Sequence, residues 1–149
     1  MEQYYIALNP EKKLADLVNN QKKLVQKTIG NQKYLQDPPH LTLIIFTTDK
    51  LNDIIQELEN IIKNFPKFNI KLKDFHVFYN DPWTKCNTIT YSLSEENLSF
   101  LRKIQLKVTD SIDKFNTKGF DYAYIGDKWI PHITIASIEL DKFDLVFEK

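Results

Sequence analysis

Two short stretches, Pro39-His40-Leu41-Thr42-Leu43 and Pro131-His132-Ile133-Thr134-Ile135, carry almost the same pattern. Each reads proline, histidine, apolar residue, threonine, apolar residue. Residues two positions apart in a β-strand lie on the same face, so each histidine shares a face with its threonine. Two such strands lying side by side would bring two imidazoles and two hydroxyl groups together. The candidate site residues are therefore His40, Thr42, His132 and Thr134.

The duplication of the pattern is stronger evidence for a functional site than a single motif match would be. The chain has only three histidines, and two of them carry the full pattern. A single copy would be weak evidence, because short motifs recur without function. The structural alternative, two histidines that merely decorate strands, stays open at this point. The third histidine, His76, lies between Phe75 and Val77, and we interpret it as a surface or edge residue.

Length and charge limit the class of protein. The chain has 149 residues, of which 42% are hydrophobic and 27% charged, so we expect one soluble globular domain over residues 1–149. Its formal net charge is +0. A protein that holds long duplex nucleic acid by neutralising phosphates should be more basic. A small phosphate-containing substrate remains allowed, and we expect no long duplex as a partner.

Cysteine and arginine are scarce. Cys86 is the only cysteine, which excludes an intramolecular disulfide framework and a cysteine-based zinc site. Arg102 is the only arginine, so bidentate guanidinium clamping of a phosphate is nearly unavailable.

No signal peptide or membrane-spanning run is evident. We therefore expect a cytoplasmic protein that acts as a monomer and has no membrane partner.

The hydrophobic pattern predicts an α+β domain. Helical spacing predicts three helices, from Pro10 (with Asn9 as N-cap) to Ile29, from Leu51 to Phe65, and from Ser94 (as N-cap) to Phe115. Strands are predicted at Tyr4–Leu8, His40–Phe46, Phe68–Leu72, Phe75–Tyr79, Asn87–Leu93, Phe120–Tyr124, His132–Ile135 and Phe143–Phe147. The lysines of the first helix, Lys22 among them, are interpreted as a solvated face, with an RNA-binding face as the alternative.

A strand and a helix precede each Pro-His stretch. This coarse repeat predicts two lobes with pseudo-twofold symmetry, predominantly antiparallel β-sheet, and helices packed outside. The two stretches would then lie at the centre of a cleft between the lobes.

Two histidines and two threonines suit a phosphodiester. A neutral imidazole takes a proton from water while an imidazolium gives one to a departing alkoxide, and threonine hydroxyls donate to the phosphate oxygens. No metal or other cofactor is expected, because neither stretch has a second histidine or a carboxylate at the spacing of a metal site. A serine-type elbow and a glycine-rich phosphate loop are also missing from the sequence.

The two His-x-Thr-x stretches resemble the paired signatures of the two-histidine (2H) phosphoesterase superfamily, also called the 2′-5′ RNA ligase-like or cyclic phosphodiesterase family. The Trp129-Ile130-Pro131 lead-in resembles it too. The resemblance implies a bilobal α+β fold and metal-independent cleavage of 2′,3′-cyclic phosphates, on nucleotides or RNA ends, or of 2′-5′ linkages. It assigns acid and base roles to His40 and His132, and phosphate binding to Thr42 and Thr134. Many relatives have an arginine soon after the second motif, where this chain has Ala136-Ser137-Ile138.

Several other residues are candidates for substrate contact. Aromatic side chains stack on bases in single-strand recognition, although packing in the core is the alternative for each of them. Lysines in turn-like segments could line the cleft. The substrate-binding candidates are Tyr5, Tyr124, Trp129 and Lys128, with Trp83 and Lys85 as further possibilities.

The sequence leaves four functions open. The first is metal-independent hydrolysis of a 2′,3′-cyclic phosphate on a nucleotide or short RNA. The second is hydrolysis of 2′-5′ or cyclic oligonucleotide second messengers by the same four residues. The third is a non-catalytic module that binds RNA or nucleotides, and the fourth is ligation, the reverse of hydrolysis.

Overall fold

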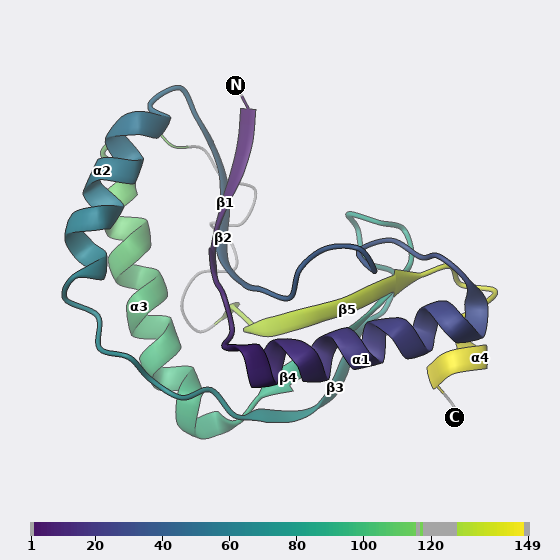
Figure 1. Ribbon diagram of the computed structural model, residues 1–149. Coiled ribbons are helices and arrows are strands. Elements are labelled where there is room, and N and C mark those ends of the chain that lie inside the picture. The colour runs from purple at the N-terminus through teal and green to yellow at the C-terminus, as the bar shows by residue number, and fades with distance from the viewer. Residues whose placement is uncertain (1, 116, 118–127, 148–149) are drawn as a thin grey trace. The chain divides into compact units, whose positions relative to one another are not determined.

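The computed structural model describes residues 2–115, 117 and 128–147 (Figure 1). The elements are β1 (Glu2–Leu8), α1 (Lys12–Ile29), β2 (Leu41–Thr48), α2 (Leu51–Ile62), β3 (Leu72–Phe78), β4 (Asn87–Leu93), α3 (Glu95–Asp113), β5 (His132–Ile138) and α4 (Asp144–Phe147). The strands have the order β1-β2-β5-β4-β3, and β5 pairs antiparallel with both of its neighbours. The predicted α+β class with antiparallel sheet is confirmed.

The chain divides into two compact units. Unit 1 consists of Met1–Ala7, Thr42–Lys71 and Leu93–Pro131, and unit 2 consists of Leu8–Leu41, Leu72–Ser92 and His132–Lys149. Each unit is therefore assembled from three separate segments of the sequence. The boundary falls between Leu41 and Thr42, inside β2.

Unit 1 is built on α2 and α3, which pack side by side (Figure 1). Its core contains Ile44, Phe46, Ile54 and Ile112, each at most 2% exposed. The buried amide of Gln105 in α3 donates to the Leu43 carbonyl oxygen at 2.8 Å, which ties this helix to β2. These contacts bury the apolar stripes that the helical spacing predicted.

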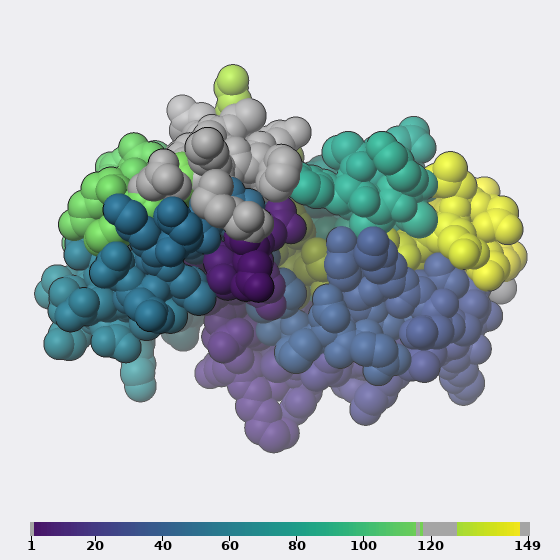
Figure 2. Space-filling model, turned by 90° about the horizontal axis from the view of Figure 1, so that it is seen from above, coloured from purple at the N-terminus to yellow at the C-terminus, as the bar shows by residue number. Residues whose placement is uncertain are grey.

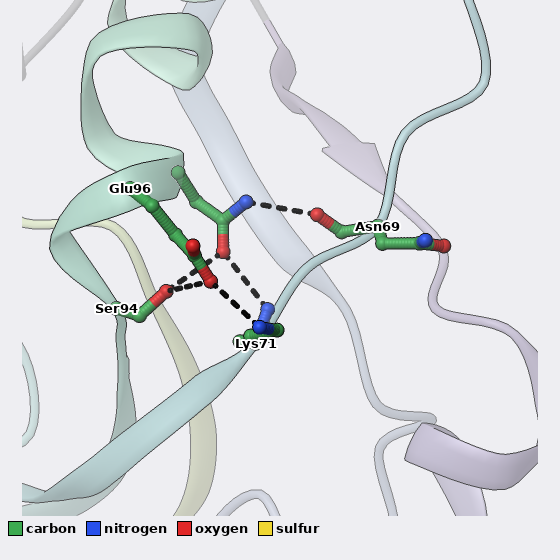
Figure 3. A network of polar contacts seen from close by, with 5 residues as sticks. Asn69, Lys71, Ser94 and Glu96 are labelled. Carbon is green, nitrogen blue, oxygen red and sulfur yellow. Dashed lines mark hydrogen bonds and ion pairs between the residues drawn. The ribbon is translucent and has the colours of Figure 1, made fainter.

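A network of hydrogen bonds connects the first turn of α3 to the segment before β3 (Figure 3). The Asn97 amide oxygen accepts from the Lys71 backbone N–H at 2.8 Å, and its amide nitrogen donates to the Asn69 carbonyl oxygen at 2.8 Å. Ser94 is the N-cap residue as predicted, but its hydroxyl makes no capping bond to the helix backbone and instead donates to Asn97 Oδ1 at 3.1 Å. Asn97 thus occupies backbone groups that a strand would use.

This network explains one wrong prediction. Phe68–Leu72 and Phe75–Tyr79 were expected as two strands, whereas β3 is a single strand, Leu72–Phe78. The Lys71 N–H and the Asn69 carbonyl oxygen bond to the Asn97 side chain, and the Lys71 carbonyl oxygen accepts from the Ser94 N–H that follows β4. Phe68 packs edge-on against Phe100 at 4.8 Å between ring centroids, so its burial needs no strand.

In unit 2, α1 packs on β5 (Figure 1). Val18 and Val25 of α1 are buried, and so are Ile133 and Ile135 of β5. Burial raises the pKa of the Tyr91 hydroxyl, and a hydrogen bond with Gln21 of α1 partly offsets this effect. The helix therefore covers the sheet face that carries Ile133 and Tyr91.

The ends of the helices differ from the predictions in small ways. The first helix begins at Lys12, after the N-cap residue Glu11, so the expected cap at Asn9 is wrong. Its end at Gly30 is confirmed: this glycine has φ +80°, a left-handed conformation that favours glycine. The second helix ends at Ile62, and the residues up to Phe65 form turns before Pro66.

The predicted C-terminal edge strand is wrong. Asp144–Phe147 form the single helical turn α4, and α4 packs beside α1 (Figure 1). Phe143 is buried at 5% exposure and its ring meets Tyr79 at 5.9 Å, while Leu145 is 51% exposed. Figure 2 shows this C-terminal segment (yellow) beside the residues that follow β3 (teal). The predicted strand at Phe120–Tyr124 lies outside the described residues.

No helix in the described part of the chain is long and apolar enough to cross a bilayer.

Replacing Ile133 by alanine should strongly destabilise the protein. Ile133 is 0% exposed and lies in register with Leu41 on one side and Tyr91 on the other. Its truncation removes buried methylene groups and leaves a cavity, at a cost of about 2–5 kcal/mol. Urea unfolding measures this change. The matched control is Ile130→Ala, at a side chain 47% exposed, which should cost less than about 1 kcal/mol. Equal effects of the two variants would contradict the assignment of Ile133 to the core.

Candidate functional site

His40 is oriented by the proline-rich segment before it. Its Nδ1 lies 2.8 Å from the Pro38 carbonyl oxygen. A carbonyl oxygen can only accept a hydrogen bond, so Nδ1 carries the proton. In the neutral ring, Nε2 is then the nitrogen that accepts a proton from a ligand. The expected strand at His40 begins one residue later, at Leu41, so this imidazole stands directly before β2.

The register of β2 and β5 brings the first histidine to the second motif. Leu41 pairs antiparallel with Ile133, and these two buried residues are 1% and 0% exposed. Continuing this register by one residue sets His40 opposite Thr134. Strand alternation turns His132 and Thr134 to the face opposite Ile133. His40, His132 and Thr134 all belong to unit 2.

Thr42 is the first residue of β2 that belongs to unit 1. It follows Leu41 directly in β2 and is half-buried. By strand alternation its side chain lies on the opposite side of β2 from Leu41.

Strand β4 extends the same face with two further hydroxyl groups. Ser92 pairs with His132 and Thr90 pairs with Thr134. The Thr90 hydroxyl, 0% exposed, donates to the His76 carbonyl oxygen of β3 at 2.9 Å. We call the face that carries His132, Thr134, Ser92 and Thr90 the motif face. It lies on the other side of the sheet from α1, which covers Tyr91.

Two aromatic rings of β3 line up beside His132. The Phe78 ring centroid lies 4.8 Å from that of His132, and the His76 ring meets Phe78 edge-on at 4.7 Å. The sequence did not identify Phe78, because it lies between Val77 and Tyr79 in a pattern whose alternation pointed to those residues. His76 lies on β3, at the edge of the sheet as expected, and is half-buried in this ring cluster.

A β-bulge adds Ser137 to the motif face. Ile89 pairs with Ala136 and Thr90 with Thr134, so Ile135 has no partner in the β4 register. Beyond the bulge Ser137 pairs with Thr88, and the two hydroxyls bond to each other. Plain alternation from Ile133 would have turned Ser137 to the α1 side. No sequence signal marked this bulge.

The hydroxyl network continues into the loop between β3 and β4. Thr88 donates to an Asp81 carboxylate oxygen at 2.7 Å, so Ser137 donates to Thr88, and the Thr84 and Ser137 hydroxyl oxygens lie 3.0 Å apart. Asp81 also accepts from the Trp83 backbone N–H at 2.9 Å. Ser137, at 1% exposure, is occupied by these partners.

The remaining sequence candidates lie in different surroundings. In unit 1, Tyr5 is 59% exposed and Lys128 is exposed. Trp129 is 6% exposed and its carbonyl oxygen accepts from Arg102 at 3.5 Å, which is the packing alternative left open for it. In unit 2, Trp83 is 50% exposed. Tyr124 lies outside the described residues.

Among the residues that the structure describes, no group of three or more histidine, cysteine, aspartate or glutamate side chains is arranged to hold a metal ion.

Replacing Phe78 by leucine should change the environment of the His132 ring. The aromatic ring at 4.8 Å exerts a ring-current shift that leucine lacks. We expect the His132 ring-proton signals to move in the NMR spectrum of Phe78→Leu. The matched control is Phe75→Leu, because Phe75 stacks on Tyr91 at 4.9 Å instead. Unchanged His132 signals in Phe78→Leu would contradict the contact.

Comparison with known proteins identifies the family of the chain. No curated protein matches the chain at a significant level. A family model described as the 2′-5′ RNA ligase superfamily matches residues 10–148, and this range contains both His-x-Thr motifs. The chain therefore belongs to the 2′-5′ RNA ligase superfamily, within the two-histidine phosphoesterases.

Proposed function

We propose that this protein is a metal-independent phosphodiesterase that hydrolyses a 2′,3′-cyclic phosphate on a nucleotide or at an RNA end. The observation that carries the proposal is the Leu41–Ile133 register, which sets His40 opposite Thr134 beside His132. Membership of the 2′-5′ RNA ligase superfamily supports the substrate class. The formal net charge of +0 suits a nucleotide or short RNA better than a long duplex.

The imidazoles of His40 and His132 carry out the proton transfers in this proposal. One neutral ring removes a proton from the attacking water as its oxygen bonds to phosphorus, and the other, protonated ring gives its proton to the ribose oxygen as the P–O bond breaks. The hydrogen bond from His40 Nδ1 to the Pro38 carbonyl oxygen directs Nε2 to this task. Two histidines exchange these roles if the reaction runs in reverse.

The threonines supply hydrogen bonds to the phosphate. The hydroxyls of Thr42 and Thr134 would donate to the non-bridging oxygens, where negative charge increases in the transition state. Fixed strand positions hold such donors without a cost of reorganisation during the reaction. No arginine follows the second motif, where the chain has Ala136-Ser137-Ile138. A lysine elsewhere, or the threonine hydroxyls alone, would therefore have to stabilise the negative charge on the phosphate.

The same residues fit a second substrate class, and the superfamily description itself favours testing it. A 2′-5′ linkage or a cyclic oligonucleotide presents the same phosphodiester with a different attached group. Ligation is the reverse of this chemistry, and water favours hydrolysis.

We propose that the chain acts as a monomer in the cytoplasm.

Removal of either motif histidine should nearly abolish hydrolysis. His40→Ala and His132→Ala each remove one proton transfer, and we expect kcat/KM for a 2′,3′-cyclic nucleotide to fall by about 10²–10⁴-fold. The matched control is His76→Ala, which should keep most of the activity because its ring lies beyond Phe78. Substrate binding without turnover in the unmutated protein would favour the non-catalytic binding module instead.

The pH profile provides an independent test of the mechanism. One histidine must be neutral and the other protonated, so kcat/KM should follow a bell-shaped curve within about pH 5 to about pH 9. EDTA should leave the rate unchanged. A flat profile would contradict paired acid–base catalysis, and strong inhibition by EDTA would contradict the metal-independent mechanism.

A substrate panel separates the two hydrolytic functions. The panel contains 2′,3′-cyclic nucleotides, 2′-5′ oligomers and cyclic dinucleotides, with products resolved by mass and by phosphate position. We expect the highest kcat/KM for the 2′,3′-cyclic phosphates. Faster cleavage of a 2′-5′ oligomer or a cyclic dinucleotide would replace this assignment by the second function.

A further inference from the structure

Lys22 is a buried cation that the proposed chemistry does not use. It was expected on the solvated face of α1, but it is 4% exposed. Its ammonium group donates to the Tyr34 carbonyl oxygen at 2.6 Å and to the Ile135 carbonyl oxygen at 3.0 Å. Burial lowers the pKa of Lys22, and the charge of Asp37 opposes this effect. Burying an ammonium group is costly unless its hydrogen bonds are satisfied, so its position calls for a reason.

One of the two acceptors is the bulge residue of β5. Ile135 has no partner in the β4 register, so its backbone departs from the regular ladder at this point. Lys22 supplies a donor to the carbonyl oxygen of that same residue. The bulge lies directly after Thr134, and it turns Ser137 to the motif face. Lys22 therefore stabilises the part of β5 that follows the second motif.

The other acceptor belongs to the segment that leads to His40. Tyr34 has φ +71°, a left-handed conformation that needs outside support in a non-glycine residue. The preceding carbonyl, that of Lys33, accepts from the Ser137 backbone N–H at 3.0 Å. Three residues after Tyr34 come Asp37 and the two prolines before His40, and these prolines leave the chain few conformations. A shift of Tyr34 would therefore be transmitted toward the His40 ring.

We propose that Lys22 is a positioning residue, which holds the segment before His40 against the bulge after Thr134 and so sets the first histidine relative to the second motif. The proposal rests on the function proposed above and names a residue that this function requires outside the motifs. All of the groups involved lie in unit 2. No substrate contact by Lys22 is needed, because it acts through the backbone of two segments.

The test compares Lys22→Met with Lys23→Met. Methionine keeps the length and apolar stem but cannot donate to either carbonyl, whereas Lys23 is its exposed neighbour on the same helix. We expect kcat for a 2′,3′-cyclic nucleotide to fall at least about tenfold in Lys22→Met, with a smaller change in KM, because small misplacements of a reacting group reduce the rate steeply. Lys23→Met should keep wild-type kcat. Both variants are measured well below their melting temperatures.

A second readout does not depend on activity. The ¹⁵N chemical shifts of the His40 ring report which nitrogen carries the proton, and the Nδ1 signal should move in Lys22→Met as the bond to Pro38 is disturbed. If the wild-type protein shows no hydrolysis but this shift is present, the proposed function fails and the positioning role survives. Wild-type kcat together with wild-type His40 shifts in folded Lys22→Met would overturn the positioning role.

Lys22→Arg keeps the test decisive if Lys22→Met does not fold. Arginine retains the charge, but its larger, planar guanidinium holds its N–H groups in a fixed fork, so its bonds to the two carbonyl oxygens would have a different geometry. We expect a folded protein with a kcat below that of the wild type and with His40 ¹⁵N shifts that differ from those of the wild type. Wild-type values for both quantities in Lys22→Arg would overturn the proposal.

Discussion

Strand β5 makes the antiparallel pairing on which the site depends. On one side it pairs with β4 over six residue positions, and on the other Ile133 pairs with Leu41. Because partners in an antiparallel pair point to the same face, this register decides which side chains can meet. A slip of one residue would turn His132 and Thr134 into the core and Ile133 out of it. The burial of the apolar residues of β5 makes any other register costly. It therefore keeps His132 and Thr134 on the motif face.

Buried polar groups fix the details that apolar packing leaves open. Lys22 donates to the carbonyl oxygen of the bulge residue Ile135, and the Thr88 hydroxyl bonds to Asp81 and to the Ser137 hydroxyl. Unsatisfied groups of this kind would each cost about 1–3 kcal/mol, so the network selects one arrangement of the strand and its loop. The His40 ring is oriented by a backbone group as well, the Pro38 carbonyl oxygen. The site is therefore specified by the surroundings of the motifs as much as by the motifs.

The sequence predicted the class of the fold and the faces of the motif strands, because these depend on alternation within a few residues. It failed where long-range hydrogen bonds decide. The strand expected at Phe68–Leu72 is absent because Asn97 binds the backbone there, and Lys22 is buried because Tyr34 and Ile135 offer carbonyls. Phe143 and Leu145 alternate as a strand would, yet only Phe143 is buried and α4 follows it. Five residues of alternation cannot separate a strand from one helical turn.

The most direct test of the proposed site is a crystal structure of the protein with a nucleoside 2′-monophosphate and one with a nucleoside 3′-monophosphate, the two products open to the proposed reaction. We expect one phosphate group within hydrogen-bond distance, about 3 Å, of both His40 and His132, and of at least one motif threonine. A phosphate held by one histidine alone, or bound away from the motif face, would contradict the proposed site.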